Sequence, residues 1–207
     1  MTQNIKQTIS CLFILLFFLG SHAKADETYE FWPGAQYDSA IPTIAQVLGY
    51  APGEKITSHG DMIRYFEALS NAAPDRMKLQ EYARSWEGRK LFYAAISSPE
   101  NIANLSALQS GIQQLSDPRK TNQAAADQLI ANLPSTVWLG YGVHGDEISS
   151  TDAAMMTAYH LLASQGNPQI DQIMKNVVTF IDPLQNPDGR TRFVHFYESS
   201  RGLLPDG

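Results

Sequence analysis

The sequence contains a single cysteine, Cys11, and it lies in an N-terminal segment that we expect to be removed. The rest of the chain then has no thiol, which excludes a disulfide framework, a cysteine-based metal site and a cysteine nucleophile. Basic residues are also scarce. Once Lys6 and Lys24 are set aside with that segment, 13 of the 15 basic residues remain against 21 acidic ones, a formal charge of −8. Such a chain has no electrostatic reason to bind nucleic acid or an anionic membrane, and neither is expected as a partner.

Long apolar runs are equally rare, and the clearest one covers residues 12–19 near the N-terminus. It is too short for a transmembrane helix, which needs about 20 apolar residues. Lys6 precedes the run, and Ala23-Lys24-Ala25 follows it with the small residues of a signal-peptidase site. We therefore predict a signal peptide over residues 1–25 and a secreted or periplasmic mature protein. The alternative is an uncleaved membrane anchor.

Residues 26–207 are sufficient for one domain, and their patterns are best defined over 55–207. Apolar spacing predicts helices over 60–73, 98–133 and 149–163. We expect Ser149 to cap the last of these helices, with Asp152 completing a capping box. Short apolar runs predict two strands within 77–97 and single strands at 136–139 and 177–181. This order predicts a three-layer α/β fold, with a mixed, largely parallel sheet and helices on both faces.

Two polar segments, 142–147 and 185–190, directly follow predicted strands, where ligands gather in open sheets of this type. In the first, His144 and Glu147 lie three residues apart. Imidazole nitrogen and carboxylate oxygen are ordinary zinc ligands. We expect Gly145 to let this loop bend and Gly142 to let the backbone pass close beneath. The pattern indicates a metal site, although His-x-x-Glu alone is also typical of a surface loop with an ion pair.

The stretch 138–147 (WLGYGVHGDE), followed by Asn186-Pro187-Asp188-Gly189 and Arg190, resembles the carboxypeptidase A-like zinc peptidases. Segment 82–90 (YARSWEGRK) resembles the strand pair of that family with its Glu-Gly-Arg turn. The resemblance implies a zinc carboxypeptidase-like fold and one zinc ion bound by His144 and Glu147. It further implies hydrolysis of the C-terminal bond of a peptide or peptide-like substrate by a zinc-activated water. We interpret the Asn-Pro-Asp-Gly turn as structural, shaping the floor of the cleft.

The same resemblance implies groups that this sequence lacks. The third zinc ligand of the family is a histidine, more than roughly 100 residues beyond His-x-x-Glu, and the general-base glutamate follows it. We expect both beyond residue 207, so that the chain is the truncated front part of a catalytic domain and is inactive alone. His195 is not expected to substitute, because its spacing is too short and it lies in an aromatic stretch, residues 192–197, that we interpret as strand-like. Arg201, twelve residues beyond Gly189, matches the family arginine that contacts the substrate and stabilises the oxyanion.

Two other functions stay open at this point. One is a zinc amidohydrolase of the aspartoacylase and succinylglutamate desuccinylase type, which the chain resembles over Val143-His144-Gly145-Asp146-Glu147. The other is a catalytically inactive module that binds peptides or cell wall, which the missing third ligand would fit.

Overall fold

The computed structural model of the chain describes residues 30–202. The chain divides into residues 1–34 and residues 35–207, and all the helices and strands below belong to the second unit. The predicted signal peptide lies outside the described residues. Among the helices that are described, none is long and apolar enough to cross a bilayer.

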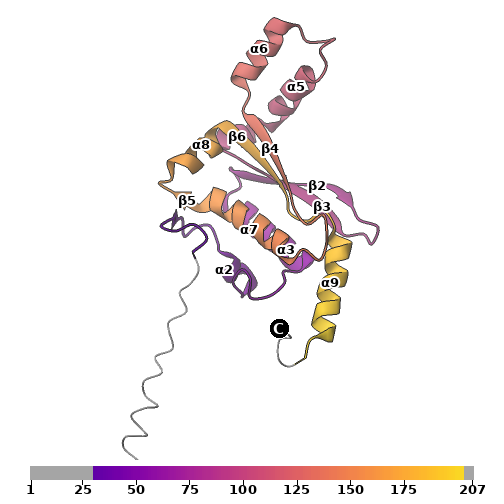
Figure 1. Cartoon of the computed structure of the whole chain (residues 1–207). Coiled ribbons are helices and arrows are strands. Elements are labelled where there is room, and N and C mark those ends of the chain that lie inside the picture. The colour runs from indigo at the N-terminus through magenta and orange to yellow at the C-terminus, as the bar shows by residue number, and fades with distance from the viewer. Residues whose placement is uncertain (1–29, 203–207) are drawn as a thin grey trace, which may run out of the picture. The chain divides into compact units, whose positions relative to one another are not determined.

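The described residues form a central sheet with the strand order β2-β3-β6-β4 (Figure 1). Its strands are β2 (Met77–Arg84), β3 (Lys90–Ile96), β6 (Val177–Asp182) and β4 (Ser135–Gly140). β4 is parallel to β6, whereas β6–β3 and β3–β2 are antiparallel. The predicted mixed sheet is therefore confirmed, although within the described strands it is less parallel than expected. A separate two-stranded pairing joins β1 (Gln36–Tyr37) to β5 (Ser164–Gln165).

Helices cover both faces of this sheet, which confirms the three-layer α/β architecture. One face packs against α3 (His59–Ala72) and α7 (Ile148–Ala163), with the shorter α2 (Ile44–Leu48) and α8 (Pro168–Asn176) at the margin of the same core. The other face packs against α4 (Pro99–Ala103) and α5 (Leu105–Leu115), beside which lies α6 (Gln123–Asn132). The last helix, α9 (Pro187–Ser200), follows β6.

The larger core lies between the sheet and the α3–α7 layer. Tyr65, Phe66 and Leu69 of α3 are completely buried in it, and the ring of Phe66 meets that of Phe92 on β3 edge to face, with centroids 5.6 Å apart. On the opposite face, Trp138 of β4 stacks on Phe180 of β6 but keeps half of its surface exposed. The fold is thus stabilised mainly from the α3–α7 side, because most of the buried apolar area lies there.

Two local predictions were wrong. Ser149 is not the cap of α7: the helix begins at Ile148, its N-cap residue is Glu147, and the Asp152 side chain accepts a hydrogen bond from Thr57 instead. The aromatic stretch 192–197, interpreted as strand-like, is part of α9. There the helix start specified by the preceding residues overrides the strand propensity of the aromatic side chains.

We expect His160 of α7 to make the stability of the fold depend on pH. Its Nδ1 lies 2.9 Å from the hydroxyl of Tyr37, and burial lowers the pKa of the imidazole. The unfolded state, whose histidines titrate near about 6.5, therefore binds a proton first as the pH falls, so folding stability is lost on acidification. We expect His160→Gln to lose less of its free energy of unfolding than the wild type between about pH 7.5 and pH 5. Urea denaturation at each pH measures this, and parallel losses in the two proteins would contradict it.

Candidate metal centre

The two candidate segments meet at the carboxyl ends of the parallel strands β4 and β6, as predicted. The β4–α7 loop (residues 141–147) runs beside the loop that joins β6 to α9. Gln185 N–H donates to Tyr141 O, and Asn186 N–H donates to Gly142 O, each over 2.9 Å. These bonds extend the strand pairing into the loops and fix the position of the β4–α7 loop.

Two glycines let the β4–α7 loop pack this closely. Gly142 has a φ of +62°, a conformation that favours glycine. A Cβ atom at Gly145 would lie 2.1 Å from the carbonyl carbon of Gly189 and 2.2 Å from the nitrogen of Arg190. Gly142 therefore provides the bend that was expected of Gly145, and it also lies close to Leu184, as expected. Gly145 instead allows a close approach to the first turn of α9.

The loop brings the two predicted metal ligands together. The Nδ1 atom of His144 lies 2.8 Å from Oε1 of Glu147, and the two side chains are 68% and 51% exposed. The hydrogen bond from the imidazole to the Glu147 carboxylate raises the pKa of His144. Two ligand atoms of one tetrahedral zinc ion lie about 3.3 Å apart, so a small rotation of either side chain would let both contact the same ion. The chemistry and spacing of this pair fit zinc.

The remaining histidines of the described residues lie elsewhere. His195 is exposed on α9, His160 is a buried residue of α7, and Nε2 of His59 is bonded to Lys90 O over 2.9 Å. Across residues 30–202, no group of three or more His, Cys, Asp or Glu side chains is placed to hold a metal. The described residues thus offer two donors, fewer than the three or four protein ligands of a typical zinc site.

Arg201 is not brought to this pair. It is the C-cap residue of α9, twelve residues beyond Gly189 and therefore about 18 Å further along the helix axis. Its guanidinium lies over the ring of Tyr197, 5.9 Å from the centroid. The oxyanion contact of Arg201 stays a prediction that its position in α9 does not support.

The Asn-Pro-Asp-Gly turn is the start of α9. Asn186 is the N-cap residue, and its side chain accepts the N–H of Gly189 over 2.9 Å. Pro187 occupies the first helical position, where its fixed φ suits the helix and its missing N–H costs nothing. The motif therefore fixes the point at which α9 begins, where its first turn packs against Gly145 of the β4–α7 loop.

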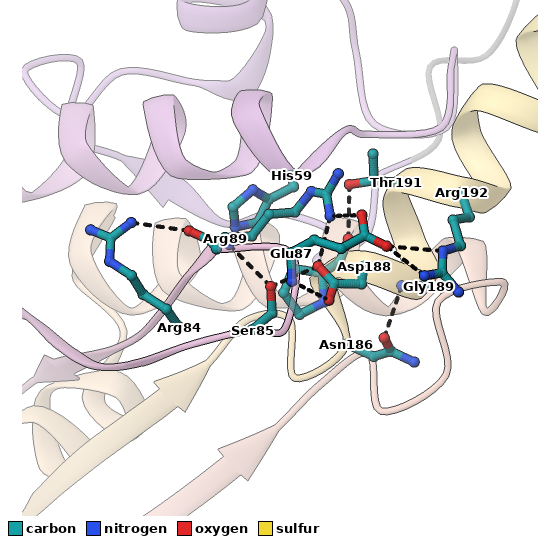
Figure 2. A network of polar contacts seen from close by, with 12 residues as sticks. His59, Arg84, Ser85, Glu87, Arg89, Asn186, Asp188, Gly189, Thr191 and Arg192 are labelled. Atoms are coloured by element: carbon teal, nitrogen blue, oxygen red, sulfur yellow. Dashed lines mark hydrogen bonds and ion pairs between the residues drawn. The ribbon is translucent and has the colours of Figure 1, made fainter.

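Asp188 connects this helix start to the Glu-Gly-Arg turn between β2 and β3 (Figure 2). Its carboxylate accepts hydrogen bonds from Ser85 Oγ over 2.7 Å, Arg89 Nη1 over 2.7 Å and Glu87 N over 3.2 Å. Burial alone would raise the pKa of Asp188, but the bonds from Ser85 and Arg89 outweigh it and lower that pKa. Arg192 of α9 adds two bonds to Glu87. The two landmark turns, about 100 residues apart in sequence, thus form one polar network.

One contact of this region was not predicted from the sequence. Arg190, which directly follows the Asn-Pro-Asp-Gly turn, is 1% exposed and donates hydrogen bonds to the β4–α7 loop. The sequence placed Arg190 beside the motif but gave it no role. A further signal was its positive charge in the first turns of a helix, where the macrodipole disfavours a cation.

Several solved structures resemble the chain. Thrombin-activatable fibrinolysis inhibitor (TAFI) is 14% identical with a TM-score of 0.48, over 72% of this chain and 31% of that one. Bovine TAFI in complex with tick carboxypeptidase inhibitor is 14% identical with a TM-score of 0.42, over 72% and 36%. Carboxypeptidase A from Helicoverpa armigera is 22% identical with a TM-score of 0.45, over 74% and 32%. The aligned part of the chain corresponds to about a third of the length of each.

A comparison with curated proteins found no match. The sequence model of one family, described as zinc carboxypeptidase, matches residues 62–197. That match covers well over half of the chain and runs from α3 through the β4–α7 loop to α9. It also confirms the resemblance seen in the sequence motifs and favours the peptidase over the amidohydrolase alternative. The chain belongs to the zinc carboxypeptidase family.

Proposed function

We propose that this chain is part of a zinc-dependent metallocarboxypeptidase, with His144 and Glu147 as two ligands of a single zinc ion. The observation that carries the proposal is the 2.8 Å approach of His144 Nδ1 to Glu147 Oε1 at the carboxyl end of β4, in a member of this family. Residues 26–207 would form the N-terminal part of a secreted or periplasmic catalytic domain. The third ligand and the general base would come from protein outside this sequence.

A zinc ion at this position would polarise a scissile carbonyl and lower the pKa of a water molecule. The chain itself supplies the binding geometry. Glu147 provides an anionic oxygen, and His144 must release its proton before its Nδ1 can bind a metal. Because both side chains are at least half exposed, a peptide can approach them directly. The Asn-Pro-Asp-Gly helix start forms the support beneath the loop rather than a substrate contact.

Zinc binding by this chain tests the metal part of the proposal. We expect His144→Ala and Glu147→Ala each to weaken zinc affinity by at least about 10-fold, measured by competition with a chromophoric chelator. His195→Ala is the matched control, because that histidine is exposed on α9, and it should keep the wild-type affinity. Wild-type affinity in His144→Ala would overturn the assignment of the site.

The substrate class needs a different experiment on the complete gene product. A carboxypeptidase should release the last residue of a peptide with a free carboxyl end, whereas an amidohydrolase should deacylate an N-acyl amino acid. The presence of only two metal donors in the described residues also keeps the peptide-binding module as a second candidate. A binding module should purify without stoichiometric zinc and hydrolyse neither substrate.

A further inference from the structure

Arg190 is the largest fully buried side chain in the described part of the protein. It lies on α9, immediately after the Asn-Pro-Asp-Gly start of that helix. Burial of a guanidinium is costly unless its donors are satisfied, so its partners indicate what it does. Those partners lie in the segment that carries the proposed zinc ligands.

All four side-chain hydrogen bonds of Arg190 end on backbone carbonyl groups. Three of the acceptors belong to residues 145–148: Ile148 O at 3.0 Å, Glu147 O at 3.3 Å and Gly145 O at 3.5 Å. The fourth, accepting from Nε at 3.0 Å, is Thr57 O. The side chain thus binds the backbone at three points: between the two proposed zinc ligands, at Glu147 itself and at the first residue of α7.

A second charge stabilises this arrangement. Burial lowers the pKa of Arg190, and the nearby Asp152 carboxylate opposes that effect. Asp152 in turn accepts a hydrogen bond from the hydroxyl of Thr57, the residue whose carbonyl binds Arg190. Buried ionic networks add little net stability compared with apolar packing. In some proteins such networks are retained because they specify one conformation.

An arginine suits this role for a geometric reason. Its planar guanidinium offers five donors in fixed directions and reaches several carbonyls at once, whereas a lysine ammonium is a single point charge. The backbone contact at Gly145 brings the loop close enough for those bonds to form. Together the two features hold His144 and Glu147 on one short, fixed segment.

We infer that Arg190 is a positioning residue: it holds the β4–α7 loop rigid, so that His144 and Glu147 face the same point before any metal binds. The claim that Arg190 orients zinc ligands rests on the function proposed above. The claim that Arg190 holds the loop rigid does not depend on that function. Groups that orient metal ligands typically change metal affinity about 10- to 100-fold when removed.

The test compares Arg190→Met, Arg190→Lys and the wild-type chain. Arg192→Met is the matched control, since Arg192 is two residues away on the same helix, carries the same charge and is 76% exposed. Backbone 15N order parameters of residues 143–148 in the metal-free protein should be about 0.85 in the wild type and below about 0.6 in Arg190→Met. Zinc affinity should fall about 10- to 100-fold in Arg190→Met, and less in Arg190→Lys. Arg192→Met should match the wild type in both measurements.

A folded Arg190→Met protein with wild-type order parameters and zinc affinity would overturn the inference. If Arg190→Met does not fold, either of two other results would overturn the inference. One is order parameters below about 0.6 for residues 143–148 in the metal-free wild type, and the other is wild-type order parameters in Arg190→Lys. Failure of the proposed function gives a different result. The wild type and His144→Ala would then bind zinc equally poorly, while the order parameters of the Arg190 variants would still decide its positioning role.

Discussion

Alanine at position 145 is expected to lower the free energy of unfolding by about 3 kcal/mol, at the upper end of the usual cost of overpacking. The added methyl group would lie 2.1 Å from the carbonyl carbon of Gly189, and backbone cannot move aside as the end of a flexible side chain can. Either the β4–α7 loop or the first turn of α9 must shift, which would break the bonds from Arg190. We therefore also expect zinc affinity at least about 10-fold weaker than in the wild type. Urea denaturation and chelator competition measure the two effects.

Gly60→Ala is the matched control for this substitution. Gly60 lies in the first turn of α3, and its added Cβ would meet only the Oγ atom of Ser58, at 3.9 Å. Alanine is favoured over glycine in a helix by up to about 1 kcal/mol, so this variant should be as stable as the wild type or slightly more stable. A Gly145→Ala protein that resembled Gly60→Ala would show that the loop does not pack on α9.

Truncating Phe66 to alanine should destabilise the fold by about 3–5 kcal/mol. The side chain is completely buried between α3 and the sheet, against the ring of Phe92, so its removal leaves a cavity that the surrounding helices can fill only in part. Because His144 and Glu147 are exposed side chains outside this core, the zinc affinity of the folded fraction should not change. Denaturant titration gives the first value and chelator competition the second.

Phe196→Ala on α9 makes the same chemical change at a side chain that is 67% exposed. It should alter the free energy of unfolding by no more than about 0.5 kcal/mol, as substitutions away from the core usually do. Similar losses for Phe66 and Phe196 would mean that the core does not lie where the structure places it.

Local patterns in the sequence predicted much of this fold. The helix expected over 60–73 is His59–Ala72, and the strands expected at 136–139 and 177–181 are Ser135–Gly140 and Val177–Asp182. Each has an apolar pattern that its own residues determine. The Ser149 cap failed because Ser149 and Asp152 have the residue types of a capping box, while Asp152 is bound by Thr57, 95 residues away.

The candidate site shows the same division between local and distant signals. His144 and Glu147 are close in sequence, so their pairing could be predicted from spacing alone. The hydrogen bonds from Arg190 to the β4–α7 loop could not be predicted. Their acceptors are backbone carbonyls, which every residue has, so no residue type in the loop indicates them. The two landmark turns were each recognised, but nothing in either sequence shows that Asp188 binds Ser85 and Arg89.

The order of these segments along the chain has a consequence for biosynthesis. Arg190 bonds to Ile148, a residue made 42 positions earlier. At translation rates of about 5–20 residues per second, the loop is synthesised roughly 2–8 s before the helix that holds it. A nascent polypeptide that has just completed α7 therefore carries the imidazole and the carboxylate on unanchored backbone. The loop conformation in which we propose that His144 and Glu147 bind zinc therefore forms only after α9 has been synthesised and has docked.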